Sequence, residues 1–202
     1  MDQALWFASR GTGLVSLLLL TATVVLGAEH AGRTAGARWP RFTVHAVHRN
    51  LSLLSLAFLA VHVGTAVADS YAGIRVVDAF LPFVSAYKPL YLGLGAVALD
   101  LMLALLITSA LRTRVPLAAW QWLHRAAYAM WPLAVVHGIG AGGKDSNLLW
   151  VQALNVICVA AVLVVVWRRL ADRRRTPAPM AVTARLPRQR TGAHSREKAF
   201  VR

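Results

Sequence analysis

The sequence predicts an all-α fold, a polytopic membrane helix bundle with five transmembrane helices, its N-terminus outside and its C-terminus in the cytoplasm. Three observations lead to this prediction: the apolar composition, the length of the apolar runs and the charge of the loops between them. Of the 202 residues, 57% are hydrophobic and only 15% are charged, whereas a soluble domain carries about 25% charged residues. The composition therefore favours a membrane protein over a soluble or disordered one.

The apolar runs define the expected spans. A helix that crosses the ~30 Å hydrocarbon core needs about 20 mainly apolar residues. Five segments satisfy this requirement: residues 11–28, 43–67, 89–111, 120–139 and 148–167. The first also has features of a signal peptide, because its apolar run ends in Gly27 and Ala28. No basic region precedes it, and Asp2 comes before Arg10, so we interpret it as a transmembrane helix.

The charges of the short loops predict the orientation. Arginine gathers in the loops after the first and third segments and after the fifth: Arg33, Arg38, Arg41, Arg112, Arg114, Arg168 and Arg169. The two loops at the opposite end carry equal numbers of acidic and basic residues. Because cytoplasmic loops are enriched in Lys and Arg, the arginine-rich end is expected to face the cytoplasm. The protein is therefore expected in the cell membrane, with the N-terminus outside.

Two regions follow from the charge distribution: a bundle over residues 1–167 and a basic tail over 168–202. The tail holds 11 of the 22 Lys and Arg residues, against only Asp172 and Glu197. From Thr176 onward it lacks helical periodicity, so we expect a disordered segment that lies against anionic lipid and binds no nucleic acid. Docking of a cytoplasmic partner is the alternative. The tail, with about 35 residues, is too short for a nucleotide-binding domain. Cys158 is the single cysteine in the sequence, which excludes an internal disulfide.

Four histidines lie within the expected spans, two on the second and two on the fourth. His48 and His62 are 14 residues apart, and His124 and His137 are 13 apart. At 1.5 Å per residue, each pair spans roughly 20 Å, so each helix carries one histidine near each membrane face. Because both helices run in the same direction, His48 and His124 are expected to form an inner pair. His62 and His137 are expected to form an outer pair.

Facing imidazoles at two depths supply axial ligands for two stacked haems. On an ideal helix, the 14-residue spacing returns the second side chain to within roughly 40° of the first, but the 13-residue spacing leaves it roughly 140° away. The fourth span therefore needs a distortion between its histidines, for which Pro132 is the candidate. His45, one turn before His48, is an alternative inner ligand. The competing interpretation is four buried histidines that bond to nearby backbone groups.

Further residues lie where they could contact haem. Arg49 and Arg125 directly follow the inner histidines, and their guanidinium groups suit haem carboxylates, although inner-face charge alone also explains them. Arg10 is expected to face the outer carboxylates or an electron acceptor. Met130 and Trp131 fall midway between His124 and His137. One of these side chains could lie between the two haems, and the alternative is that it only packs in the core.

Asp100 is a carboxylate near the centre of the third span. A charged Asp there costs roughly 2.5–3.5 kcal/mol on insertion scales. We therefore expect a protonated group that donates a hydrogen bond to a neighbouring helix. Uptake of protons as the haems are reduced is the alternative.

The pattern His48-x13-His62, a span without histidine, and then His124-x12-His137 resembles the ferric reductase-like transmembrane domain. This superfamily includes ferric-chelate reductases, NADPH oxidases and the haem subunit of periplasmic methionine sulfoxide reductase. The likeness covers residues from about 6 to 167. Two further segments carry it, Lys-Pro-Leu-Tyr-Leu-Gly over 88–93 and Trp-Gln-Trp-Leu-His-Arg-Ala-Ala-Tyr over 120–128.

The resemblance implies a transmembrane b-type cytochrome with two haem b groups, a single haem being the alternative. Its usual core has six helices, of which the first is missing from the five expected here, and no part of this sequence resembles the family's flavin and nicotinamide domain. An oxidoreductase component is therefore expected, which takes electrons from a separate flavin reductase or from quinol. Ferric chelates or an extracytoplasmic redox protein would accept them. A histidine-lined metal or proton transporter, or a haem-binding module without turnover, is the alternative.

Overall fold

The computed structural model describes residues 3–30, 40–70 and 72–175, and every regular element in these ranges is helical. The expectation of an all-α fold is confirmed. The predicted tail from Thr176 onward lies outside the described residues. The elements in chain order are α1 (Gln3–His30), α2 (Arg41–Ala68), α3 (Val76–Phe80), α4 (Pro89–Ala110), α5 (Leu117–Arg125), α6 (Ala127–Ala141), the 3₁₀ helix η2 (Gly143–Asn147) and α7 (Leu149–Arg175).

Four helices in the described part of the chain are long and apolar enough to cross a membrane. They are α1, α2, α4 and α7, and they correspond to four of the five expected spans. Two of them extend well beyond the predicted apolar runs: α1 begins at Gln3, eight residues before its run, and α7 continues to Arg175, eight residues after its run. Polar residues therefore extend the start of α1 and the end of α7 without ending the helix.

The expected span over 120–139 is divided into α5 and α6, with Ala126 at the junction. At this point the N–H of Ala126 donates to Leu123 O at 2.9 Å and the N–H of Ala129 donates to Ala126 O at 2.9 Å. These are i to i−3 bonds, which wind the chain by about 120° per residue where an α-helix turns by about 100°. A distortion between the two histidines was expected, and the structure places one at Ala126, six residues before Pro132, which lies inside α6. A kink at Pro132 itself stays a prediction. The fifth span itself stays a prediction.

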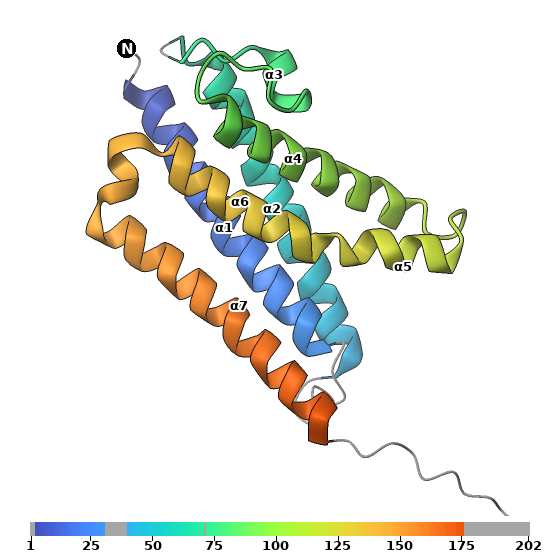
Figure 1. Ribbon diagram of the computed structural model, residues 1–202. Helices are drawn as coiled ribbons and strands as arrows, with labels where there is room; N and C mark the ends of the chain where they lie inside the picture. The colour runs from blue at the N-terminus through green and yellow to red at the C-terminus, as the bar shows by residue number, and fades with distance from the viewer. Residues whose placement is uncertain (1–2, 31–39, 71, 176–202) are drawn as a thin grey trace, which may run out of the picture.

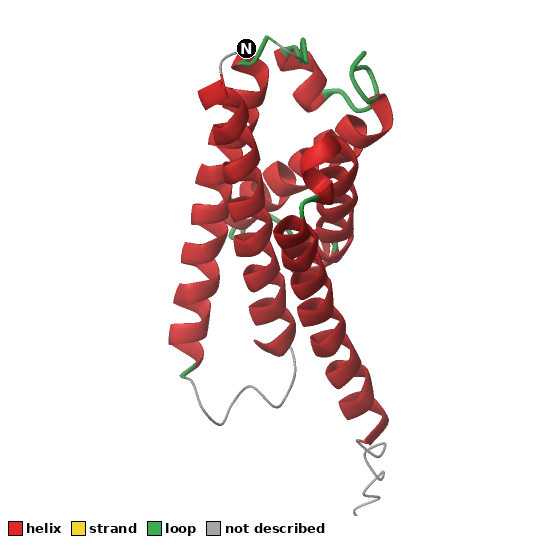
Figure 2. Ribbon diagram, turned by 90° about the vertical axis from the view of Figure 1, so that its left-hand side faces the viewer, coloured by secondary structure: helices red, strands yellow, loops and turns green. Residues whose placement is uncertain are grey.

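The bundle is organised around α1. This helix packs against α2 on one side and against α7 and α6 on others, while α4 packs against α6 and has α3 beside its N-terminal end. Figures 1 and 2 show α1, α2 and α7 as long helices that run beside one another, with α4 and the α5–α6 pair beside them. The buried core lies where α1, α4, α6 and α7 meet and includes Leu17, Leu20, Leu105, Met130, Trp131 and Cys158.

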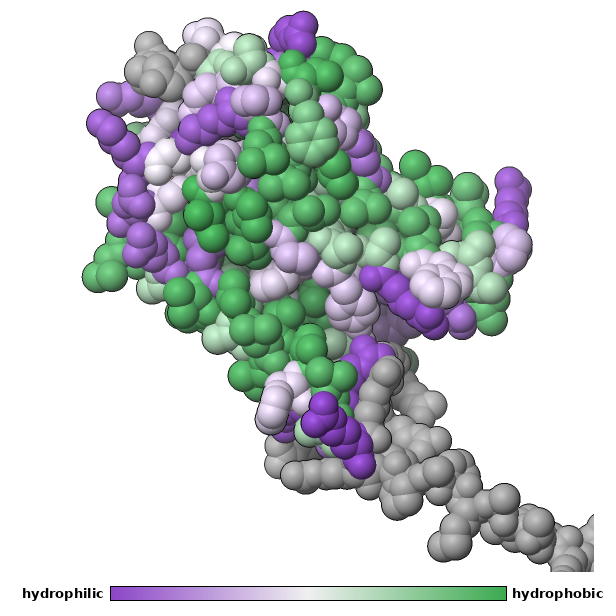
Figure 3. Space-filling model, in the orientation of Figure 1, coloured by the Kyte–Doolittle hydropathy of each residue, from purple (hydrophilic) through white to green (hydrophobic). Residues whose placement is uncertain are grey.

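The outer surface of the bundle is apolar along much of its length. On α7, for example, Val156, Ile157 and Leu163 are each at least 60% exposed. Figure 3 shows hydrophobic side chains over the middle of the visible face and hydrophilic ones mainly toward its edges and ends. Such a surface suits the hydrocarbon of a bilayer, which has the same preference for apolar side chains as a protein core.

The connection from α2 to α4 is held by one ion pair at the start of α3. Arg75 Nη2 lies 2.8 Å from Asp78 Oδ1, and the backbone N–H of Arg75 donates to Asp78 Oδ2 at 3.0 Å. This is a capping arrangement that satisfies the first turn of a short helix. The hydrogen bonds from Arg75 hold the pKa of the Asp78 carboxyl below its usual range.

We expect the stability of this connection to depend on acid pH. Since the pKa of Asp78 is lowered on folding, its contribution is complete above the ordinary carboxyl pKa and is lost as the pH falls through the lowered value. Hydrogen exchange of the α3 amides, followed from pH 6 down to pH 2 after correction for the intrinsic rate, measures this loss. Asp78→Asn should exchange faster at pH 6 and approach the wild type at the acid end. Equal protection at pH 6 would contradict this role.

Candidate functional site

The structure brings the four span histidines together in two pairs. The ring centroids of His48 and His124 are 6.3 Å apart, and those of His62 and His137 are 6.2 Å apart. One pair lies toward each end of the bundle, and in both pairs α2 contributes one ring. The second ring comes from α5 at the inner pair and from α6 at the outer pair.

The spacing of both pairs fits a metal ion held between two imidazoles. A metal–imidazole bond is about 2.0–2.1 Å long and a ring nitrogen lies about 1.1 Å from the ring centre, so two trans ligands have centroids about 6.2–6.4 Å apart. Without an ion, two nitrogens that face each other at this separation are about 4 Å apart, beyond hydrogen-bond distance. The distances therefore fit bis-histidine ligation. The angles of 57° and 82° between the ring planes also fit a tilted or edge-to-face ring contact.

Each histidine of the outer pair contacts a backbone carbonyl through its Nδ1. His62 Nδ1 lies 2.7 Å from Ser9 O, and His137 Nδ1 lies 2.8 Å from Tyr91 O. Because a carbonyl oxygen only accepts hydrogen bonds, Nδ1 must carry the proton in both rings. The Nε2 lone pair is then free for a metal, which is the usual arrangement of metal-binding histidines.

Glycines on the neighbouring helices make room for these rings. A Cβ at Gly13 of α1 would lie 2.9 Å from His62 Nδ1, and one at Gly95 of α4 would lie 2.5 Å from His137 Nδ1. Each glycine comes four residues after the carbonyl that its histidine contacts, Ser9 or Tyr91. On a helix these two positions lie on one face, so the missing side chain gives the imidazole access to the carbonyl.

A third glycine lies against the inner pair. A Cβ at Gly27 would be 3.3 Å from His48 Cε1. Gly13 and Gly27 are 14 residues apart, the same separation as His48 and His62 on the antiparallel α2. The sequence interpretation missed this row of glycines, although the equal spacing is visible in the sequence.

The inner pair has a different environment. The indole of Trp120 stacks on the ring of His124, with centroids 4.8 Å apart and planes at 16°. Among the described residues, His124 Nδ1 and Trp120 Nε1 are buried without a hydrogen-bond partner. The stacking of Trp120 on His124 is a second contact that the sequence interpretation missed.

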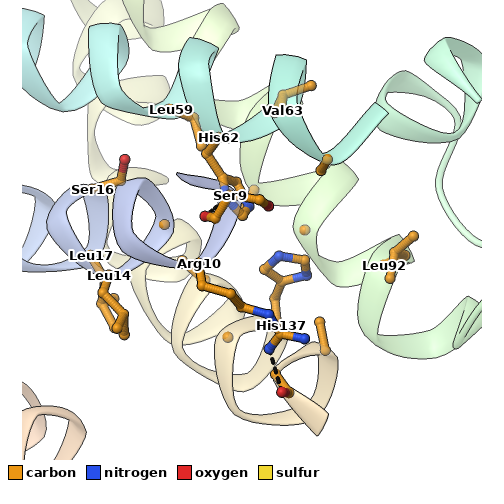
Figure 4. A pocket seen from close by; sticks show the side chains of 18 of the residues that line it. Ser9, Arg10, Leu14, Ser16, Leu17, Leu59, His62, Val63, Leu92 and His137 are labelled. Carbon is orange, nitrogen blue, oxygen red and sulfur yellow. Dashed lines mark hydrogen bonds between the residues drawn. The ribbon is translucent and has the colours of Figure 1, made fainter. Parts of the chain in front are cut away.

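A cavity of about 450 Å³ surrounds the outer pair. Its lining includes Trp6 near the start of α1, Trp150 near the start of α7, and Met130 on α6. Figure 4 shows His62 beside Ser9 on one side of the cavity, with His137 and Arg10 on the other. This volume is within the range of cofactor-binding pockets.

Two cations hold the end of α6, close to His137. The Arg10 guanidinium donates to Gly142 O, and Lys88 Nζ donates to Gly140 O at 2.9 Å. The last carbonyls of a helix lack partners within it and attract positive charge. Arg10, which was expected near the outer site, lines the cavity. Its hydrogen bond also fixes the end of α6, the helix that carries His137.

The two arginines expected beside the inner site are exposed. Arg49 lies on α2, and the Arg125 guanidinium lies 5.1 Å from the ring centre of Trp122. Contacts of both arginines with haem stay a prediction. His45, the alternative inner ligand, is exposed on the first turns of α2.

Residues expected between the two sites differ in their placement. Met130 is 3% exposed and lines the cavity. Trp131 packs in the core, where its Nε1 donates to Thr21 Oγ1 at 2.9 Å. Its place between two haems stays a prediction. Asp100 lies half-buried on α4.

Four apolar helices of spanning length and an apolar surface define a multi-pass membrane protein. The family model of the ferric reductase like transmembrane component matches residues 12–135, which is more than half of the chain. The chain therefore belongs to this family, whose transmembrane domains generally bind haem. No curated protein and no solved structure matches the chain. The matched range ends two residues before His137.

The glycine contacts generate a test by substitution. Gly95→Ala should reduce haem binding by this member of a generally haem-binding family, because the new methyl group meets the His137 ring at 2.5 Å and displaces it from Tyr91 O. Haem per polypeptide, measured on the purified protein, should fall below the wild-type value. Gly64→Ala on α2 is the control, since a Cβ there meets nothing within 4 Å and Gly64 does not line the cavity. An unchanged haem content in Gly95→Ala would contradict the close packing.

Proposed function

We propose that this protein is a b-type cytochrome that passes electrons across the membrane through two haems. The observation that carries the proposal is the pair of imidazole separations, 6.2 and 6.3 Å, which both match the span of a metal between two histidines. Membership of the ferric reductase-like family supports it, since that family is associated with transmembrane electron transfer.

His62 and His137 would hold the outer haem, and His48 and His124 the inner one. Haem bound between two imidazoles has no open coordination position and supplies one-electron transfer. Ser9 O and Tyr91 O accept hydrogen bonds from the outer ligands, which fixes their tautomer and raises their basicity. Arg10 lies at the outer site, and Arg49 and Arg125 would pair with haem carboxylates at the inner end.

The proposal includes a fifth crossing, made by α5 and α6 together. From Leu117 to Ala141 the two helices cover 25 residues, which is about 37 Å of helix and enough for the hydrocarbon core. The arginine-rich loops support an orientation with the inner pair near the cytoplasm and the N-terminus outside. The inner and outer sites then lie near opposite faces of the membrane.

Electrons would enter one at a time from a cytoplasmic flavin reductase or from membrane quinol. Haem held by His48 and His124, and haem held by His62 and His137, would supply one-electron transfer between that donor and an acceptor outside. A ferric chelate that accepts one electron would become ferrous, and an extracytoplasmic redox protein would take up one electron likewise. The chain would therefore act as an oxidoreductase component that needs a separate donor.

The visible spectrum of the purified protein tests haem binding. We expect a low-spin b-type spectrum after reduction with dithionite and about two haems per polypeptide. His62→Ala and His124→Ala should each lose about one haem, because each removes a ligand from a different site. His45→Ala is the matched control on α2 and should keep both. If the protein is produced with abundant haem and still contains none, the proposal is refuted. The same histidines should then be tested for metal binding.

Electron transfer across the membrane is a separate test. Liposomes that contain the protein and enclose dithionite should reduce external ferricyanide, which does not cross the bilayer. The rate should fall on the order of tenfold or more in His62→Ala, since one of the two haems in the path is lost. His45→Ala should retain the wild-type rate. If the haem-loaded protein reduces no external acceptor, this result would favour the alternative, a haem-binding module without turnover.

A further inference from the structure

Three side chains stack at the inner end of the bundle. Trp120 lies on the His124 ring, with centroids 4.8 Å apart and planes at 16°. The Arg112 guanidinium carbon lies 5.0 Å from the centre of the same indole. Arg112 comes from the turn after α4, whereas Trp120 and His124 lie one helical turn apart on α5. The stack therefore connects the exposed loop before α5 to one of the histidines of the inner pair.

His124 differs from the outer histidines in how its ring is held. Both outer rings contact a backbone carbonyl at 2.7 or 2.8 Å, on α1 or on α4. Among the described residues, His124 Nδ1 has no hydrogen-bond partner although it is buried. An imidazole without such a bond can rotate about its Cβ–Cγ bond unless something packs on its face. Trp120 is the aromatic ring that packs there.

We propose that Trp120 is a positioning residue for the inner haem, which orients the plane of the His124 imidazole by stacking, and that Arg112 holds the indole in place. This inference rests on the proposed haem function. Offset-stacked aromatic rings are more stable than the same rings merely buried, and a guanidinium over the indole adds a cation–π contact. The two contacts replace the carbonyl bond that fixes each outer ligand.

The same helix offers a comparison that separates this role from general membrane anchoring. Trp122 lies two residues from Trp120, is 71% exposed and also has an arginine over its ring, with Arg125 at 5.1 Å. Tryptophan is common at membrane interfaces, which accounts for Trp122. Interfacial preference does not account for Trp120, whose ring lies on a histidine and whose Nε1 is buried.

The test uses electron paramagnetic resonance of the oxidised full-length protein, because the g values of low-spin ferric haem depend on the orientation of the axial imidazole planes. Trp120→Leu should shift one of the two low-spin signals and leave the other unchanged. The shifted signal should be the one that His124→Ala abolishes. Inner haem should also be lost about three- to tenfold more readily to a haem acceptor, the range expected for one stacking contact. Trp122→Leu is the matched control and should leave both signals unchanged.

Two further variants separate the parts of the stack. Trp120→Phe keeps an aromatic face but removes the N–H, so it should retain most of the wild-type signal if stacking is what matters. Arg112→Gln should cause a smaller shift of the same signal than Trp120→Leu. Unchanged signals in Trp120→Leu, or equal effects on both haems, would overturn the inference while leaving the proposed function intact. A wild-type protein without haem would instead overturn the proposed function.

Discussion

The spacing between neighbouring helices depends on one kind of contact, a hydrogen bond from a histidine ring to a backbone carbonyl of the helix beside it. The geometry needs a carbonyl at one position and a glycine four residues later, as in Ser9 with Gly13 and Tyr91 with Gly95. A side chain at either glycine would push the imidazole away, and the helices with it. The approach of α1 to α2, and of α4 to α6, is therefore set by the same contacts that orient the outer pair.

The division between α5 and α6 follows from the spacing of the histidines. Fourteen residues on α2 bring both of its rings to one side of a regular helix, but thirteen residues on the partner helix do not. The tight turn at Ala126 adds rotation in the direction that brings His137 toward His62 while His124 faces His48. An interrupted helix is what allows two histidines 13 residues apart to face the two histidines of α2, which are 14 residues apart.

Apolar runs and histidine spacing were enough to predict the helical bundle and which histidines lie opposite one another. Both features depend on regular helix geometry along one chain direction. The position of the break was not predictable in this way, because alanine at 126 is a strong helix former and gives no signal of a break, whereas Pro132 lies inside α6. The stack of Trp120 on His124 was missed because a tryptophan near a membrane face is already explained by interfacial preference.

The outer and inner pairs are held by different parts of the molecule. The outer rings are fixed by carbonyls of α1 and α4, and the end of α6 is fixed by Arg10 and Lys88. These contacts join separate helices, so the outer geometry is as rigid as the bundle itself. His124 instead contacts Trp120 on its own helix, and Arg112 connects that contact to an exposed turn. A displacement of this turn would therefore move the ring of His124 without changing the contacts that hold the outer pair.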